Sequence, residues 1–239
     1  MADFRPRLRG GIKKAYENLV KVENRVLVIG DPHEPFSVPG YLKFCKEQYI
    51  IHNCNKVVFI GDIIDNHYSS FHEVEINADY TGKYELEQAI KKLSKWYKAF
   101  PNADVTIGNH DRIIIRKAQS SNIPSKWIKE YKEVLETPNW NFVTEVYIDG
   151  VRYVHGDKSG KPKMAAKRDM VSTVSGHYHT DMYVEWFFGK TRAIFGMAVG
   201  CGIDSKSYAM GYMQGGKKEA IGCGIVIGGH TAFNVKMSL

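Results

Sequence analysis

The chain has 239 residues, and its 33 basic and 26 acidic side chains give a formal net charge of +7. Hydrophobic residues make up 44% and charged residues 25%, which excludes a chain disordered throughout. The length suits one domain over residues 1–239, with 1–24 as a basic extension and 180–239 as strands that complete the fold. The positive charge favours an anionic partner, such as a phosphate or a nucleic acid.

The sequence offers no sign of secretion or of a membrane partner. Its N-terminal segment is polar and basic, without the apolar core of a secretory signal. The longest nearly apolar stretch, residues 193–203, is broken by glycines and is too short to span a bilayer. We therefore expect a cytoplasmic protein.

The cysteines do not form a recognisable framework. No C-x-x-C pair occurs, which argues against a zinc finger or a thioredoxin-like motif. We expect four reduced, buried thiols, at Cys45, Cys54, Cys201 and Cys223.

The first half of the chain alternates between strand and helix patterns. Short apolar, β-branched runs that stop at a glycine predict buried strands at residues 25–30, 56–61 and 104–108. Helices are expected at residues 41–53, 83–100, 112–118 and 124–135. Residues 66–80 are polar and aromatic, which predicts a loop.

The second half is mostly β. Strands are predicted at residues 141–148, 151–155, 171–176, 182–188, 193–199, 221–227 and 232–237. One helix is expected among them, at residues 161–169. Because no linker divides the halves, this order indicates one sheet-rich α/β or α+β domain.

Five predicted strands end in Asp, Asn or His, most of them beside glycine. The segments are Gly30-Asp31-Pro32-His33, Gly61-Asp62-Ile63-Ile64-Asp65, Gly108-Asn109-His110-Asp111, His155-Gly156-Asp157 and Gly176-His177-Tyr178-His179. Loops beyond strand ends are where α/β proteins build their sites. Asp31 and His33 are two residues apart, as are His177 and His179, so each pair can face one ion from an extended backbone. Imidazole, carboxylate and amide donors without thiolate favour Mn, Fe, Zn or Ni over Mg or Ca.

The ordered blocks D-x-H, GD-x-x-D, GNHD, H-G and GH-x-H resemble the calcineurin-like metallophosphoesterase superfamily over about three fifths of the chain. Residues 61–73, GDIIDNHYSSFHE, with the GNHDR and HGD blocks, further resemble small members encoded by bacteriophages, which would place the protein in the host cytoplasm. The resemblance implies an α/β (α+β) fold, a four-layer αββα sandwich of two mixed β-sheets. It places the metal site at the C-terminal edges of the strands.

The resemblance also implies roles for individual residues. The implied ligands are Asp31, His33 and His179 for one divalent ion, Asn109, His155 and His177 for a second, and Asp62 bridging both. His110 would lie over the substrate phosphate as acid or transition-state stabiliser. Either Asp65 or Asp111 would orient that histidine.

The implied activity is hydrolysis of a phosphomonoester or phosphodiester, in a nucleotide or another small phosphate, through in-line attack by a metal-bridging hydroxide. Two ions can clamp the attacking and leaving oxygens of such a displacement. We expect Mn²⁺ to work in assays. Substrate contacts are predicted at Arg112, His67 and Lys158.

One departure from the family pattern bears on the substrate. In protein Ser/Thr phosphatases the second block continues D-R-G, whereas here Asp65 is followed by Asn66 and His67. The arginine that grips phosphate is missing there, which makes a protein phosphatase a weaker alternative. The basic charge keeps a nuclease open as an alternative. A non-enzymatic, metal-stabilised scaffold is the least favoured, because no expected ligand is missing. The native metals and the oligomeric state stay open.

Overall fold

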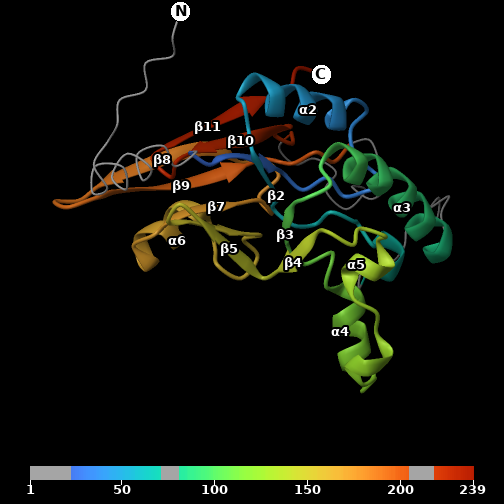
Figure 1. Cartoon of the computed structure of the whole chain (residues 1–239). Helices are drawn as coiled ribbons and strands as arrows, with labels where there is room; N and C mark the ends of the chain where they lie inside the picture. Colours follow the sequence, from blue (N-terminus) through green and yellow to red (C-terminus); the bar gives the residue numbers. More distant parts are fainter. Residues whose placement is uncertain (1–22, 71–80, 205–217) are drawn as a thin grey trace, which may run out of the picture.

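Two mixed β-sheets lie face to face in the computed structural model, which describes residues 23–70, 81–204 and 218–239 (Figure 1). The strands of the first sheet are β1 (Arg25–Ile29), β2 (Lys56–Phe59), β3 (Asp104–Thr106), β4 (Asn141–Val143), β10 (Gly222–Ile227) and β11 (Thr231–Lys236). Those of the second are β5 (Glu145–Ile148), β6 (Val151–Val154), β7 (Ser172–Ser175), β8 (Met182–Phe188) and β9 (Ala193–Val199).

Helices cover the outer faces of both sheets. The helical segments are α2 (Tyr41–Ile51), α3 (Gly82–Ala99), α4 (Ile113–Ser120), α5 (Tyr131–Val134) and α6 (Pro162–Asp169), with 3₁₀ turns η1 (His67–Ser69) and η2 (Ser125–Trp127). In Figure 1, α2 and α3 lie against the first sheet, while α6 packs on β7 and β9 of the second. The predicted four-layer αββα sandwich is therefore confirmed.

The order and direction of the strands place the ends of several of them at one edge of the sheets. The first sheet runs β11-β10-β1-β2-β3-β4, and β1 to β4 are parallel, so the C-terminal ends of β1, β2 and β3 lie at one edge. The second sheet runs β5-β6-β7-β9-β8, with β6, β7 and β9 parallel. Strands β8 and β9 join the second sheet and β10 and β11 the first, so the C-terminal third of the chain contributes to both sheets.

The side chains of the central strands point alternately into two different cores, which explains the layers of the sandwich. In β1, Leu27 and Ile29 belong to the core under the helices, whereas Val26 and Val28 belong to the core between the sheets. All four are essentially buried. A strand that is apolar on both faces needs a cover on each side, which the helical layer and the second sheet provide.

Two predicted elements are wrong. The single strand predicted at residues 141–148 is two strands, because β4 pairs with β3 in the first sheet and β5 pairs with β6 in the second. The chain changes sheets at Thr144, where the sequence has no glycine or proline to signal a break. The helix predicted at residues 124–135 is reduced to η2 and the short α5. Its first half has no core to pack against, since Trp127 is 82% exposed.

The cysteines and the helices can also be compared with what the sequence predicts. All four cysteines are free and buried, as predicted. Among the described residues, no helix is long and apolar enough to cross a bilayer. Residues 1–22 of the predicted extension 1–24 and residues 71–80 of the predicted loop 66–80 lie outside the described residues.

The helix-side core depends on an aromatic cluster around Phe59. Its ring lies 5.5 Å from that of Trp96 and 4.7 Å from that of Trp140, and all three side chains are buried. We expect Phe59→Ala to lower the free energy of unfolding by about 3–5 kcal/mol, because it leaves a cavity among rings that cannot collapse into it. Urea unfolding measures this.

Phe188→Ala is the matched control, because Phe188 is 83% exposed. It should change the free energy of unfolding by no more than about 0.5 kcal/mol. Similar losses for the two variants would contradict this description of the core.

Candidate metal centre

Five loops meet at the C-terminal edges of the strands, and backbone hydrogen bonds fasten the first two together. The His33 amide donates to the Asp62 carbonyl at 2.9 Å, and the Glu34 amide donates to the Ile63 carbonyl at 2.9 Å. Ligand loops also bind each other's carboxylates. The His177 amide donates to Asp31 Oδ2 at 2.6 Å, and the His110 amide donates to Asp62 Oδ1 at 2.8 Å.

A first group of donors consists of Asp31, His33 and His179. His33 Nε2 lies 3.2 Å from His179 Nε2, and His179 Nε2 lies 3.2 Å from Asp31 Oδ2. The other carboxylate oxygen, Asp31 Oδ1, is buried and has no hydrogen-bond partner among the described residues. Three donor side chains within a few ångströms, one of which has a buried oxygen without a hydrogen bond, fit a metal ion.

A second group consists of Asp62, His155 and His177, to which Asn109 adds an amide oxygen. His155 Nε2 lies 3.1 Å from Asp62 Oδ2 and 2.9 Å from Asn109 Oδ1. Asp62 Oδ2 is also 3.8 Å from His33 Nε2 of the first group. The structure thus brings all seven predicted ligands together, with Asp62 between the two groups.

Hydrogen bonds to Nδ1 aim three histidines at the centre through Nε2. His33 Nδ1 donates to Asp65 Oδ1 at 2.6 Å, and His155 Nδ1 donates to the Ile60 carbonyl at 3.0 Å. His110 Nδ1 donates to the Asp65 carbonyl at 2.6 Å. Such bonds fix the tautomer and leave the Nε2 lone pair free for a ligand or a proton.

Three of the predicted ligands have left-handed backbone conformations, so the extended backbone expected for the pairs Asp31/His33 and His177/His179 is wrong. His177 and His179 also belong to different groups of donors. The φ angles are +47° at His33, +45° at Asp62 and +66° at His177. Non-glycine residues adopt this region at a cost, and such residues gather at functional sites. In this structure the unfavourable backbone conformations coincide with predicted metal ligands.

Glycines give the carboxylates their room. A Cβ on Gly108 would lie 2.0 Å from Asp62 Oδ1, and one on Gly176 would lie 2.1 Å from Asp31 Oδ1. Both distances are far below van der Waals contact. The glycines beside the ligands in the sequence therefore permit close approach between loops.

Buried opposite charges shift the pKa values of the donors. Burial opposes a charge on His155, but Asp62 and Asp31 outweigh it and raise its pKa to about 10. Burial and the nearby His110 lower the pKa of His33, and burial and His155 lower that of His177. The metal-free centre therefore holds a proton on His155 at neutral pH.

The two candidates for orienting His110 play different parts. Asp65 binds the His110 ring through its carbonyl, and its carboxylate Oδ1 lies 3.4 Å from His110 Nδ1. The Asp111 carboxylate accepts the backbone N–H groups of Gly108, Ile63 and Ile64, at 2.8, 3.1 and 3.4 Å. Asp111 thereby ties the second ligand loop to the third, whereas Asp65 contacts the ring.

The three predicted substrate contacts lie in different settings. Arg112 is largely buried and bonded to Asp157 and to the Ile107 carbonyl. His67 is buried, with Nδ1 4.0 Å from Asp65 Oδ2. Lys158 is exposed.

Glu85 is a residue of the site that no sequence motif marks. It belongs to the first turn of α3, is buried, and accepts the backbone N–H groups of His67 at 2.7 Å and Tyr68 at 3.1 Å. Burial raises its pKa to about 7. Glu85 thus fixes η1 beside Asp65. A glutamate in an amphipathic helix, 18 positions from its partner, gives no signal in the sequence.

Comparison with known proteins agrees with this geometry. The sequence model of the family described as calcineurin-like phosphoesterase matches residues 24–232. The chain belongs to the calcineurin-like phosphoesterase family. The resemblance read from its motifs is confirmed, and the protein is a metal-dependent phosphoesterase. The further likeness to bacteriophage-encoded members stays a prediction.

Solved structures similar to this calcineurin-like phosphoesterase are distant. Vacuolar protein sorting 29 from Cryptosporidium parvum is 14% identical, with 91% of this chain and 99% of that chain covered and a TM-score of 0.46. YfcE, a phosphoesterase from E. coli, is 14% identical over 84% of this chain and 90% of its own, with a TM-score of 0.41. A single mutant of Vps29 from Entamoeba histolytica is 13% identical over 90% of this chain and 99% of its own, with a TM-score of 0.36. No curated protein sequence matches the chain.

The glycine contacts lead to a first test of the centre. Gly108→Ala would drive a methyl group into Asp62, so we expect metal affinity to fall at least about tenfold, as for changes that disturb metal-ligand positions. Metal content after dialysis against graded chelator measures this. Gly150→Asn is the control, since no atom lies within 4 Å of its Cβ position and asparagine accepts positive φ. Equal metal content in both variants would argue against Asp62 as a ligand.

Metal uptake should also release protons. Because the pKa of His155 is about 10 without metal, the imidazole must lose a proton before Nε2 can bind an ion at pH 7. We expect roughly one proton or more released per chain, and a metal affinity that rises with pH up to about 10. Titration calorimetry in buffers of different ionisation enthalpy counts these protons. A heat independent of the buffer would contradict the assignment.

Proposed function

We propose that this phosphoesterase uses two divalent ions to hydrolyse a phosphomonoester or phosphodiester in a nucleotide or another small phosphate. The observation that carries the proposal is the position of Asp62, whose Oδ2 lies 3.1 Å from His155 Nε2 and 3.8 Å from His33 Nε2. A carboxylate shared between two groups of nitrogen donors suits a pair of ions. Mn²⁺ is our choice for assays, and Fe, Zn and Ni match the same donors.

The chain's residues divide the work of holding two ions. Asp31, His33 and His179 would hold one, and Asn109, His155 and His177 would hold the other, with Asp62 between them. When bound, two such ions supply positive charge to the phosphoryl oxygens and a water that ionises near neutral pH.

His110 is placed to act as the general acid. Its ring lies edge-on to that of His33 at 4.6 Å, so it borders the first group of donors. Its Nδ1 proton is held by the Asp65 carbonyl, which leaves Nε2 to give a proton to the leaving oxygen. Burial disfavours its charged form, but Asp62 and Asp65 outweigh this and raise its pKa. A raised pKa favours the protonated form that a general acid needs.

The surroundings of Arg112 bear on the substrate. Its guanidinium is bonded to Asp157, so its charge is already balanced. Together with the missing arginine after Asp65, this makes a protein phosphatase the weaker alternative.

The role of His110 can be tested with substrates of unequal leaving groups. We expect His110→Gln to lower kcat by about 10²–10⁴-fold on phenyl phosphate, whose leaving oxygen needs a proton. On p-nitrophenyl phosphate, with its stable phenolate, the loss should be much smaller. Steady-state kinetics with Mn²⁺ measures both. Equal losses on the two substrates would show that His110 does not supply that proton.

A second variant, Asp62→Asn, tests whether the protein hydrolyses phosphoesters at this centre. We expect activity on bis-p-nitrophenyl phosphate and p-nitrophenyl phosphate to fall at least about 10³-fold, because the shared charge is lost. Far-UV circular dichroism checks that the variant folds. Hydrolysis by the wild type no faster than by this folded variant would contradict the proposed function.

A further inference from the structure

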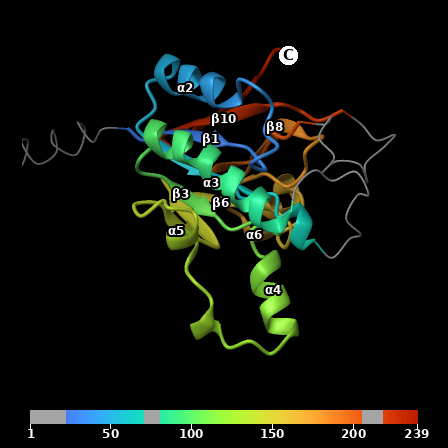
Figure 2. The ribbon, with the colours of Figure 1, turned by 90° about the vertical axis from the view of Figure 1, so that its right-hand side faces the viewer.

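A helical arm starts beside the metal centre and extends away from the sandwich. It comprises residues 113–130, and in Figures 1 and 2 its helix α4 projects below the two sheets. Residues 119–127 are all exposed. The arm begins two residues after Asp111, so its base adjoins the loop that carries His110. The proposed hydrolysis does not explain why the arm is there.

Trp127 near the tip of the arm is 82% exposed, whereas Trp96 and Trp140 are buried in the core. Tryptophan is enriched at binding interfaces, because its ring is apolar and its N–H is polar. Its sequence neighbours Ser125 and Lys126 are polar and exposed, and Ile123, four residues earlier, is 47% exposed. An exposed aromatic ring beside a cation suits stacking on another flat ring.

The arm is also basic. Residues 113–130 carry four positive side chains and one negative one, namely Arg116, Lys117, Lys126 and Lys129 against Glu130. Lys129 pairs with Glu133 and Lys132 with Glu130, whereas Lys126 makes no ion pair with any described residue. The charge beside the exposed ring is therefore positive, which suits phosphates.

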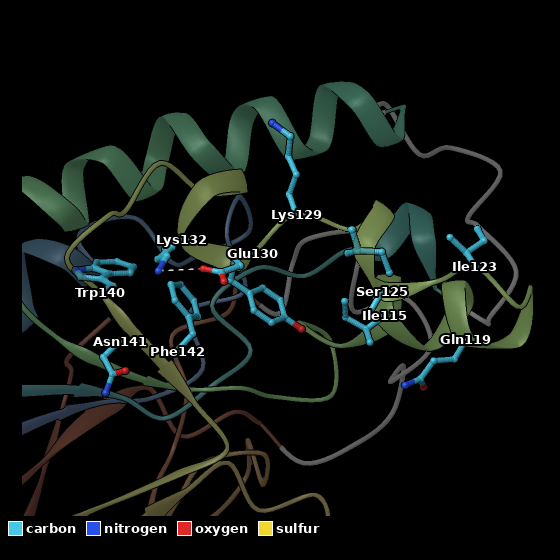
Figure 3. Close-up of a pocket in the computed structure, with 12 residues that line it drawn as sticks. Ile115, Gln119, Ile123, Ser125, Lys129, Glu130, Lys132, Trp140, Asn141 and Phe142 are labelled. Carbon is cyan, nitrogen blue, oxygen red and sulfur yellow. Dashed lines mark ion pairs between the residues drawn. The ribbon is translucent and has the colours of Figure 1, made fainter.

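A groove of ≈ 470 Å³ runs between the arm and β4. Figure 3 shows Trp140 and Phe142 at one end of it and Ile123 and Gln119 at the other. Tyr131 stacks on Phe142 with centroids 5.4 Å apart, and its hydroxyl donates to the Asp111 carbonyl at 3.1 Å. The groove has the size and aromatic lining of a small-ligand site, and Tyr131 links it to the catalytic loop.

We propose that the arm binds a single strand of nucleic acid, with a base stacked on Trp127 and phosphates held by Lys126 and its neighbours. Aromatic platforms combined with positive charge bind single strands with little sequence preference. The excess of positive charge on the arm favours a polyanion over a protein partner. The binding itself is a claim separate from the proposed function, and only the use of the bound strand as substrate, in place of a small phosphate, rests on that function.

The binding test uses the full chain with EDTA, so that binding is measured without turnover. Anisotropy of a fluorescein-labelled dT20 strand reports affinity for the wild type and for Trp127→Ala, Trp127→Phe and Phe188→Ala. We expect Trp127→Ala to weaken binding about 5- to 100-fold through the loss of one stacked base. Trp127→Phe should retain most of the affinity. Phe188→Ala, an equally exposed aromatic on β8, should retain all of it.

Two further measurements separate stacking from a general structural effect. Quenching of tryptophan fluorescence by dT20 in the wild type should be largely lost in Trp127→Phe. Lys126→Gln should lower the slope of log affinity against log salt by about 0.7, as for one lost phosphate contact on a single strand.

Wild-type affinity in Trp127→Ala, or no binding of dT20 by the wild type, would overturn the inference. So would a dimer seen by sedimentation that Trp127→Ala dissociates, because the arm would then be an interface between copies. Binding of dT20 through Trp127 without hydrolysis of any phosphoester would contradict the proposed function alone. Hydrolysis of small esters without binding of dT20 would contradict this inference alone.

Discussion

Four carboxylates are buried at one edge of the sandwich, and the arrangement of the site follows from the need to compensate their charge. The side chains of Asp31, Asp62, Asp65 and Asp111 are all at most 3% exposed. Carboxylates so placed are costly unless hydrogen bonds, protons or cations compensate them. Backbone amides satisfy Asp111, and His33 donates to one carboxylate oxygen of Asp65, whose other oxygen has no hydrogen-bond partner among the described residues. Asp31 and Asp62 keep oxygens turned toward imidazoles, and a divalent cation is what that arrangement is built to accept.

The fold meets this constraint through strand ends and tight loops. Parallel pairing brings the ends of β1, β2 and β3 to one edge, and the face-to-face second sheet adds the loops after β6 and β7. Left-handed backbone at His33, Asp62 and His177 turns donors inward, and Gly108 and Gly176 let the loops touch. The apolar cores on both sides of β1 and β2 hold these loops in place. Packing far from the centre thereby preorganises it.

The sequence predicts the parts whose signal is local. Motifs at strand ends mark the donor side chains, from Asp31 to His179, that the structure brings together, and two-sided apolar strands indicate the sandwich. Contacts between residues far apart in the chain cannot be predicted from local sequence patterns. Glu85 meets η1 across a helix, and Arg112 meets Asp157 across 45 residues. The switch of sheets at Thr144 and the exposure of Trp127 depend on which surfaces are free in the folded protein, which periodicity does not encode.

The central claim is that Asp62 stands between two metal sites. Crystals grown with Mn²⁺ and measured on both sides of the manganese absorption edge test it directly, because anomalous differences locate the ions without assumptions about the chain. The account predicts two peaks per chain about 3.5–4 Å apart, one beside His33 and His179, the other beside His155 and Asn109, with Asp62 contacting both. A single peak, or peaks away from Asp62, would contradict it.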